Sequence, residues 1–203
     1  MQQRVAAVMS IPPDAPDEVL VANLAIPHRA EDAYWLLMSR GMAAVPAVRA
    51  GLRSQDARVR YQCCRVLDHW LTEDVLPELV AMLEDDDPRV LMQVLHSLTC
   101  ERCKEGSCRP DEAAVLAGAL RLMKEHPSPH VRAMAIEVVG ASAHQSVVAL
   151  DALEEVRAAD PSPAVRKKAS WFVPGRAVLP EDPACLARER TRFETCDSRS
   201  CRP

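Results

Sequence analysis

Apolar residues recur along the middle of the chain at intervals of three, four, seven and eight residues. Three stretches show this pattern clearly, and they begin at Val59, Val90 and Val131. Such intervals place the apolar side chains on one side of an α-helix, so each stretch predicts a helix with one buried face. A further amphipathic helix is predicted over residues 30–40.

A similar short segment precedes each of these helices, and it recurs once more before Val165. These segments combine Asp or Ser with a valine that begins the apolar face, and they cover residues 54–60, 85–91, 127–132 and 161–166. Asp and Ser side chains cap helices by accepting hydrogen bonds from the first turn, and proline suits the first helical position. The valines Val59, Val90, Val131 and Val165 are 31, 41 and 34 residues apart. These distances are typical of a two-helix repeat, with an insertion between the second and third units.

Another helix is predicted upstream of each cap, over residues 42–52, 75–83, 113–124 and 148–158. In the first two, a proline lies inside the helix, at Pro46 and Pro77. A proline-bent first helix, an Asp in the turn and Val-Arg at the start of the second helix resemble HEAT repeats over about residues 41–173. The resemblance implies an all-α fold, a right-handed α-α superhelix (HEAT-like solenoid) of about four helix pairs, with the helix at 30–40 as an N-terminal cap.

The repeat domain is predicted to span residues 30–176. Residues 1–29 and 177–203 lack helical periodicity and are rich in proline or charge, so an irregular N-terminal arm and a flexible C-terminal tail are expected. The composition fits a helical core. Hydrophobic residues make up 48% of the chain but aromatic residues only 3%, so the core must come mainly from Ala, Val, Leu and Met, which suit closely packed helices.

The net charge and the motifs of the chain argue against several classes of function. The net charge is −4, whereas proteins that hold a nucleic-acid backbone usually present a basic surface, so a nucleic-acid partner is not expected. No apolar run is long enough for a membrane span, and the N-terminus does not resemble an export signal, which predicts a cytoplasmic protein. The sequence contains no phosphate-binding glycine loop and no nucleophile or zinc-protease motif, so no catalytic residue is predicted.

A non-catalytic protein-interaction or scaffold module is the function that the repeats favour, with a protein as partner. Its binding surface is predicted on the concave face and includes Arg60, Gln93, Arg132 and Arg166. The three arginines occupy equivalent positions, so they either pair with turn carboxylates or form a basic ridge. HEAT-like DNA glycosylases, which resemble the chain in architecture only, provide an alternative function. The sequence does not indicate an oligomeric state.

A cysteine-rich segment fills the long spacing between the second and third units, within residues 100–110. Cys100 and Cys103 have the two-residue separation that lets two thiolates bind one Zn²⁺, and Cys108 follows closely. A fourth ligand could be His96, one helical turn before Cys100, or His69, which the 31-residue repeat places beside Cys100. The segment therefore predicts a possible structural zinc site.

Two other interpretations of these cysteines stay open. They could be reduced thiols beside a loop, as expected in the cytoplasm. Alternatively, Cys100 and Cys103 could form a reversible disulfide and make the protein a metal- or thiol-responsive regulator. The sequence indicates no role for the tail cysteines, which are Cys185, Cys196 and Cys201.

Overall fold

The computed structural model describes residues 11–99 and 112–173, and in this part of the chain all regular secondary structure is helical. Successive helices form five pairs: α2 (Asp17–Asn23) with α3 (Ala30–Arg40), α4 (Val45–Gly51) with α5 (Ala57–His69), α6 (Leu76–Ala81) with α7 (Pro88–Thr99), α8 (Glu112–Glu125) with α9 (Pro129–Ala141), and α10 (Val147–Ala159) with α11 (Pro163–Ala169). Two short 3-10 helices complete the first helices of two pairs: η1 (Gly41–Ala44) precedes α4, and η2 (Met82–Glu84) follows α6.

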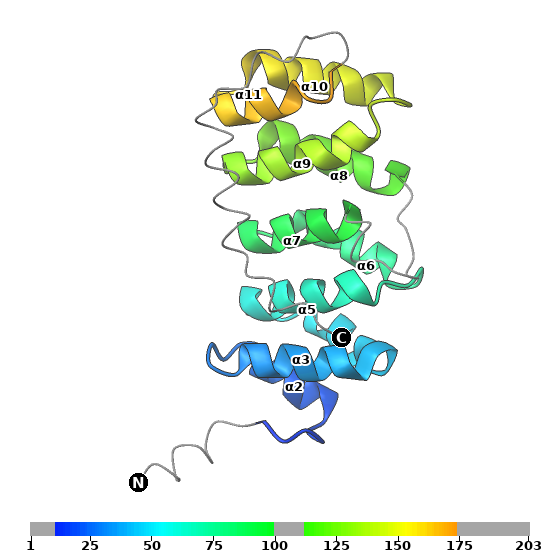
Figure 1. The fold of residues 1–203 in the computed structure, drawn as a ribbon, viewed down its shortest axis with the longest axis vertical. Coiled ribbons are helices and arrows are strands. Elements are labelled where there is room, and N and C mark those ends of the chain that lie inside the picture. The colour runs from blue at the N-terminus through cyan, green and yellow to red at the C-terminus, as the bar shows by residue number, and fades with distance from the viewer. Residues whose placement is uncertain (1–10, 100–111, 174–203) are drawn as a thin grey trace, which may run out of the picture. The chain divides into compact units, whose positions relative to one another are not determined.

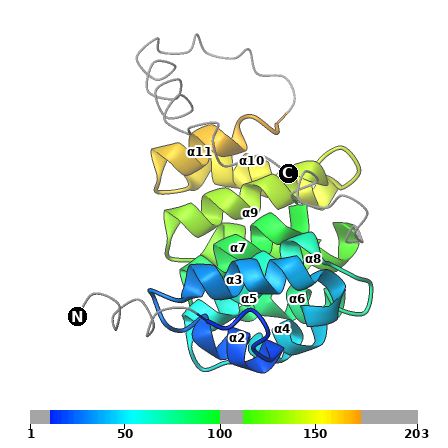
Figure 2. The same ribbon diagram turned by 60° about the horizontal axis from the view of Figure 1, so that its bottom comes forward.

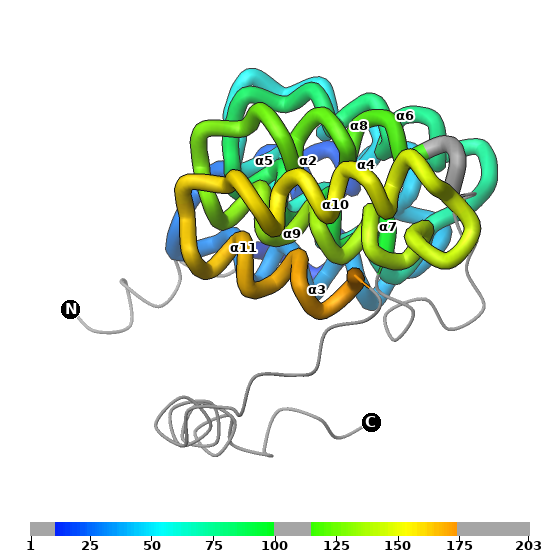
Figure 3. Tube along the Cα trace, turned by 90° about the horizontal axis from the view of Figure 1, so that it is seen from above, coloured from blue at the N-terminus to red at the C-terminus, as the bar shows by residue number. Residues whose placement is uncertain are grey.

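The pairs stack in chain order, from α2 and α3 to α10 and α11 (Figure 1). The second helices make one continuous layer, because α3, α5, α7, α9 and α11 each pack against the next. In the other layer, α2 packs on α4, and α8 packs between α6 and α10. Figure 2 shows α9 between α7 and the last pair, α10 and α11, and Figure 3 shows α10 and α11 side by side. The predicted all-α stack of helix pairs is confirmed.

The N-terminal caps follow the prediction in part. The side chains of Asp56 and Asp87 each accept a hydrogen bond of 2.8 Å from the backbone N–H two residues later. Ser128 and Ser162 also stand at cap positions, but their hydroxyls accept no such bond. Those two helices instead begin with proline at the first position, where the missing N–H leaves one fewer group to satisfy.

Pro46 and Pro77 do not bend the middle of a helix, which corrects the prediction. Each is the second residue of a short α-helix, α4 or α6. A proline in the first turn removes no internal hydrogen bond, whereas in the interior it would break one. The predicted helices over residues 42–52 and 75–83 are therefore composite, with one 3-10 segment and one α segment in each.

The predicted apolar faces are buried between the two layers. The four positions predicted for each of α5, α7 and α9 are at most 5% exposed: Val59, Cys63, Val66, Leu67, Val90, Val94, Leu95, Leu98, Val131, Ala135, Val138 and Val139. Aliphatic residues supply most of this core. Packing between neighbouring pairs therefore stabilises each helix, which alone is too short to be stable in water.

Cys63 and its neighbour Cys64 lie inside this core as free thiols. Burial raises the pKa of Cys63 to about 12 and that of Cys64 well above its usual value, since a thiolate there would lose its hydration. In this environment Cys63 acts as a small buried hydrophobic residue.

Residues 11–29 are not irregular, contrary to the prediction. They contain α2, whose Leu20 and the adjoining Leu24 are fully buried against α3 and α4. The expected capping helix α3 is therefore the second member of a complete pair. With seven residues, α2 is too short to show a helical period in the sequence. The predicted tail at 177–203 lies outside the described residues.

Candidate partner-binding groove

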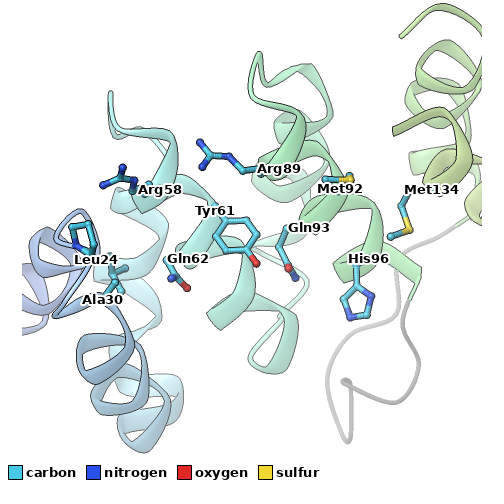
Figure 4. A pocket seen from close by; sticks show the side chains of 11 residues that line it. Leu24, Ala30, Arg58, Tyr61, Gln62, Arg89, Met92, Gln93, His96 and Met134 are labelled. Carbon is cyan, nitrogen blue, oxygen red and sulfur yellow. The ribbon is translucent and has the colours of Figure 1, made fainter. Parts of the chain in front are cut away.

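A groove of about 810 Å³ runs across the layer of second helices. It begins at Leu24 and Ala30 in the first pair, crosses α5 and α7, and reaches Met134 of α9. Figure 4 shows its side chains arranged along successive helices. The groove therefore follows the repeat axis over four pairs.

The centre of the groove is built from residues at equivalent positions of α5 and α7. Counted from the first residue of each helix, the second is Arg58 or Arg89, the fifth is Tyr61 or Met92, and the sixth is Gln62 or Gln93. In Figure 4 the two arginines lie on the same side of the groove, and Tyr61 lies between Gln62 and Gln93. The repeat thus creates two similar adjoining subsites, each with a cation, an apolar side chain and an amide.

The lining of the groove contains arginine but no aspartate or glutamate among the described residues. Asp87, just outside the lining, accepts hydrogen bonds from Nη2 and Nε of Arg89 at 2.7 and 3.1 Å. This contact, assisted by the backbone N–H of Arg89, lowers the pKa of Asp87 to about 2. Asp87 therefore stays ionised and fixes Arg89 at the rim, where the arginine side chain is 61% exposed.

His96 lies at the end of the groove near the C-terminus of α7. Its Nε2 is 3.3 Å from Oδ2 of Asp68, and the Asp68 side chain is only 4% exposed. The pair joins α7 to the end of α5. A buried carboxylate that contacts one ring nitrogen fixes the orientation of the imidazole.

Arg60 connects α5 to the turn before α7. Its Nε and Nη2 donate to the carboxylate of Asp85 at 2.6 and 2.9 Å, and its Nη1 donates to the carbonyls of Ser54 and Gln55. Burial disfavours the charged form of Asp85, but hydrogen bonds from Arg60 and from the N–H of Asp87 outweigh it and lower the pKa of Asp85. The ion pair therefore ties two repeats together.

Arg132 makes the same connection between α9 and the turn before α11. Its Nε and Nη2 donate to Asp160 at 2.8 and 2.9 Å, and its Nη1 donates to the carbonyls of His126 and Pro127. The two charged side chains are 8% and 4% exposed. Burial raises the pKa of Asp160, but bonds from Arg132 and the N–H of Ser162 reverse the shift and lower it.

The predicted binding surface therefore needs correction. Arg60 and Arg132 are largely buried and engaged between repeats, so they do not form a basic ridge. Arg166 donates to the backbone carbonyl of Asp160 at 2.6 Å and is half-buried. Gln93 is the one predicted residue that lines the groove. The arginines at the groove are Arg58, two residues before Arg60 in α5, and Arg89, at the equivalent position of α7 and four residues before Gln93.

The structure addresses only part of the predicted metal site. Cys100, Cys103 and Cys108 lie outside the described residues. Of the two histidines considered, His96 contacts Asp68, and His69 is half-buried at the end of α5. Within residues 11–99 and 112–173, His, Cys, Asp and Glu side chains form no group of three that could hold a metal ion.

Sequence reasoning missed several groove residues, although a signal was available. Arg58 and Arg89, like Gln62 and Gln93, are 31 residues apart, which is the repeat distance already derived from the valines. Polar residues that recur at the repeat distance on one helix face indicate a shared surface. The tryptophans do not contribute to it, because Trp35 and Trp171 are exposed elsewhere and Trp70 packs against Gly41.

Stacked helix pairs with aligned second helices and a lateral groove define the class of α-solenoid proteins. Within this class, residues 45–122 match the family model described as HEAT repeats. This match confirms the resemblance to HEAT repeats over residues 45–122. Comparison with curated proteins and with solved structures gave no match. In the part of the chain that the structure describes, no helix is long and apolar enough to cross a membrane.

Proposed function

We propose that this protein is a non-catalytic interaction module that binds a segment of a partner protein in the groove over α5 and α7. The observation that carries the proposal is the groove itself, with its apolar floor and its repeated arginine and glutamine side chains. HEAT repeats generally act as protein-interaction or scaffold modules, which agrees with this role.

The extent of the groove favours a polypeptide over a small molecule. It touches four successive helix pairs, and neighbouring helices pack about 8–10 Å apart, so it extends over roughly 24–30 Å. Tyr61, Met92 and Met134 supply apolar contact area, and methionine adapts its shape to different side chains. A chain of about eight extended residues matches this length.

A peptide-display selection tests the proposal. The full-length protein is used to enrich peptides from a random library, and each enriched peptide is measured for affinity against two variants. Tyr61→Ala with Met92→Ala removes the apolar floor, and we expect it to weaken binding at least about tenfold, the loss typical of truncating two buried contact residues.

Val148→Ala provides the matched control, because Val148 is an exposed apolar residue outside the groove, on α10. The Val148→Ala variant should bind each enriched peptide with the same affinity as the unchanged protein. Equal binding by the groove variant and the control, with both variants folded by circular dichroism, would place recognition elsewhere and overturn the proposal. Failure to enrich any peptide would overturn it too.

We further propose a structural zinc ion bound by Cys100, Cys103, Cys108 and a histidine, as the sequence predicts. The contact between His96 and buried Asp68 supports His96 as the fourth ligand, because metal-binding histidines usually place their other nitrogen against a carboxylate. Elemental analysis should give about one zinc per chain, and Cys103→Ser should lose it. Less than about 0.2 zinc per chain in both proteins would refute the site.

A glycosylase function gains no support from the groove. Such an enzyme needs a carboxylate beside the flipped base, and none of the described lining residues is acidic.

A further inference from the structure

We infer that the groove selects a segment in polyproline II conformation that carries two acidic side chains three residues apart. The inference rests on the proposed function and specifies its ligand. Two observations support it, the identical placement of Arg58 and Arg89 and the absence of acidic residues among the described lining. The usual distance between packed helices provides the third argument.

The charges of the groove favour an acidic ligand. Arg58 and Arg89 lie on the same side of the groove (Figure 4). Asp87 accepts from Nε and Nη2 of Arg89, and Nη1 makes no hydrogen bond to any described residue. Nη1 of Arg58 donates a long hydrogen bond of 3.5 Å to the backbone carbonyl of Ala25. Both guanidinium groups can therefore still donate charge-assisted hydrogen bonds to a ligand carboxylate.

The repeat distance selects the conformation of the ligand. Equivalent residues of α5 and α7 are one helix spacing apart, about 8–10 Å. A polyproline II helix rises about 3.1 Å per residue with three residues per turn, so side chains three residues apart lie about 9 Å apart on the same side. In a β-strand, side chains three residues apart point to opposite faces. At a spacing of three residues, polyproline II therefore brings two carboxylates to Arg58 and Arg89 together, whereas a β-strand does not.

The other lining residues suit the same ligand. A polyproline II segment has no internal hydrogen bonds, so its carbonyls need donors. Arg65 donates to Oε1 of Gln62 at 2.7 Å, which engages the amide oxygen and makes the amide nitrogen the group that can donate to a ligand. Gln93 offers a second amide one repeat further on; its Nε2 donates one hydrogen to Oγ of Ser97 at 3.2 Å and has a second N–H for a ligand. Tyr61 and Met92, at equivalent positions of α5 and α7, provide the apolar surface on which proline rings pack.

A spaced peptide library tests the inference. Two glutamates are held two, three or four residues apart in a proline-containing frame, and the remaining positions are randomised. Selection with the full-length protein should enrich the three-residue spacing. Its best peptides should bind at least about tenfold more tightly than the best peptides of the other two spacings, and replacing either glutamate by glutamine should weaken them about fivefold to tenfold.

Two arginine variants and a matched control complete the experiment. Arg58→Gln and Arg89→Gln should each weaken binding about fivefold to tenfold, and the dependence of affinity on salt should decrease in both. Arg53→Gln should change neither, since Arg53 is a more exposed arginine, 74% accessible, outside the groove. Equal enrichment of all spacings, or equal effects of the three variants, would overturn the inference.

The random-library selection described above separates the two failures. If random peptides bind the groove but the three-residue spacing has no advantage, the proposed function stands and the ligand assignment fails. If no peptide depends on Tyr61 and Met92, both fail.

Discussion

Among the described residues, two of the four junctions between successive second helices carry a buried ion pair, and two carry none. Arg60 and Arg132 are each the fourth residue of their helix, and their carboxylate partners Asp85 and Asp160 each stand three residues before the next second helix. At the equivalent positions, the junction between α7 and α9 has Leu91 and His126, and that between α3 and α5 has Ala33 and Ser54.

The comparison separates two roles of the turn residue, by which we mean the residue three positions before the second helix of each pair. In all four junctions its side chain accepts a hydrogen bond from the N–H two residues later, whether it is aspartate, serine or histidine: Ser54, Asp85, His126 and Asp160. Only aspartate also binds an arginine from the preceding repeat. The turn itself therefore needs an acceptor, and the negative charge is present only where an arginine is buried against it.

The largest effect is expected from breaking the more buried pair. Asp160→Ala leaves Arg132 charged and almost fully buried, so we expect the free energy of unfolding to fall by about 3–5 kcal/mol. Denaturant-induced unfolding monitored by circular dichroism measures the change.

The matched control converts this junction to the uncharged kind. Arg132→Leu with Asp160→His reproduces the pair found at Leu91 and His126. It should recover most of the loss, because removing both charges leaves neither one unpaired. A double variant as unstable as Asp160→Ala would show that the junctions are not interchangeable.

A smaller effect is expected at the first ion pair. Asp85→Ala should lower the free energy of unfolding by about 1.5–3 kcal/mol, since Arg60 is more exposed and keeps Asp86 at 3.0 Å and two backbone carbonyls. The same denaturation experiment decides the order. A loss larger than that of Asp160→Ala would contradict the idea that burial sets the contribution of each pair.

The smallest effect is a difference in acid sensitivity. The pKa values of Asp85 and Asp160 are lowered in the folded protein, so the unfolded chain binds their protons more readily. Their contribution to stability is complete above the unfolded pKa of about 4 and is lost as pH falls through the lower, folded pKa. Stability measured from pH 5 to pH 2 should therefore fall less steeply for Arg132→Leu with Asp160→Asn than for the unchanged protein. Parallel curves would refute the assignment.

The sequence predicted the second helix of each pair better than the first helix of each pair. The apolar faces of α5, α7 and α9 follow from local periodicity, so the residues alone indicate them. By contrast, α2 has seven residues, and its helical state depends on packing of Leu20 and Leu24 against α3 and α4. Such tertiary stabilisation leaves little local pattern.

The site was harder to predict because equivalent arginines have different environments. The sequence analysis selected Arg60 and Arg132 for their repetition, but repetition also marks contacts between repeats. Arg58 stands two positions before Arg60 in α5 and recurs one repeat later as Arg89, and both of these arginines lie at the groove. Which helix face points to the neighbouring repeat and which to the solvent follows from how the pairs stack, and spacing alone does not contain that information.

The buried thiols of Cys63 and Cys64 provide a natural probe of transient opening at the centre of the stack. Because both stay protonated and inaccessible while α5 is packed, a thiol reagent can modify them only during transient exposure. When reclosing is faster than modification, the labelling rate at Cys63 divided by that of an open cysteine gives the opening equilibrium constant. Peptide-resolved mass spectrometry would then follow, in the unaltered chain, how ligand binding in the groove changes the opening of the helix beneath it.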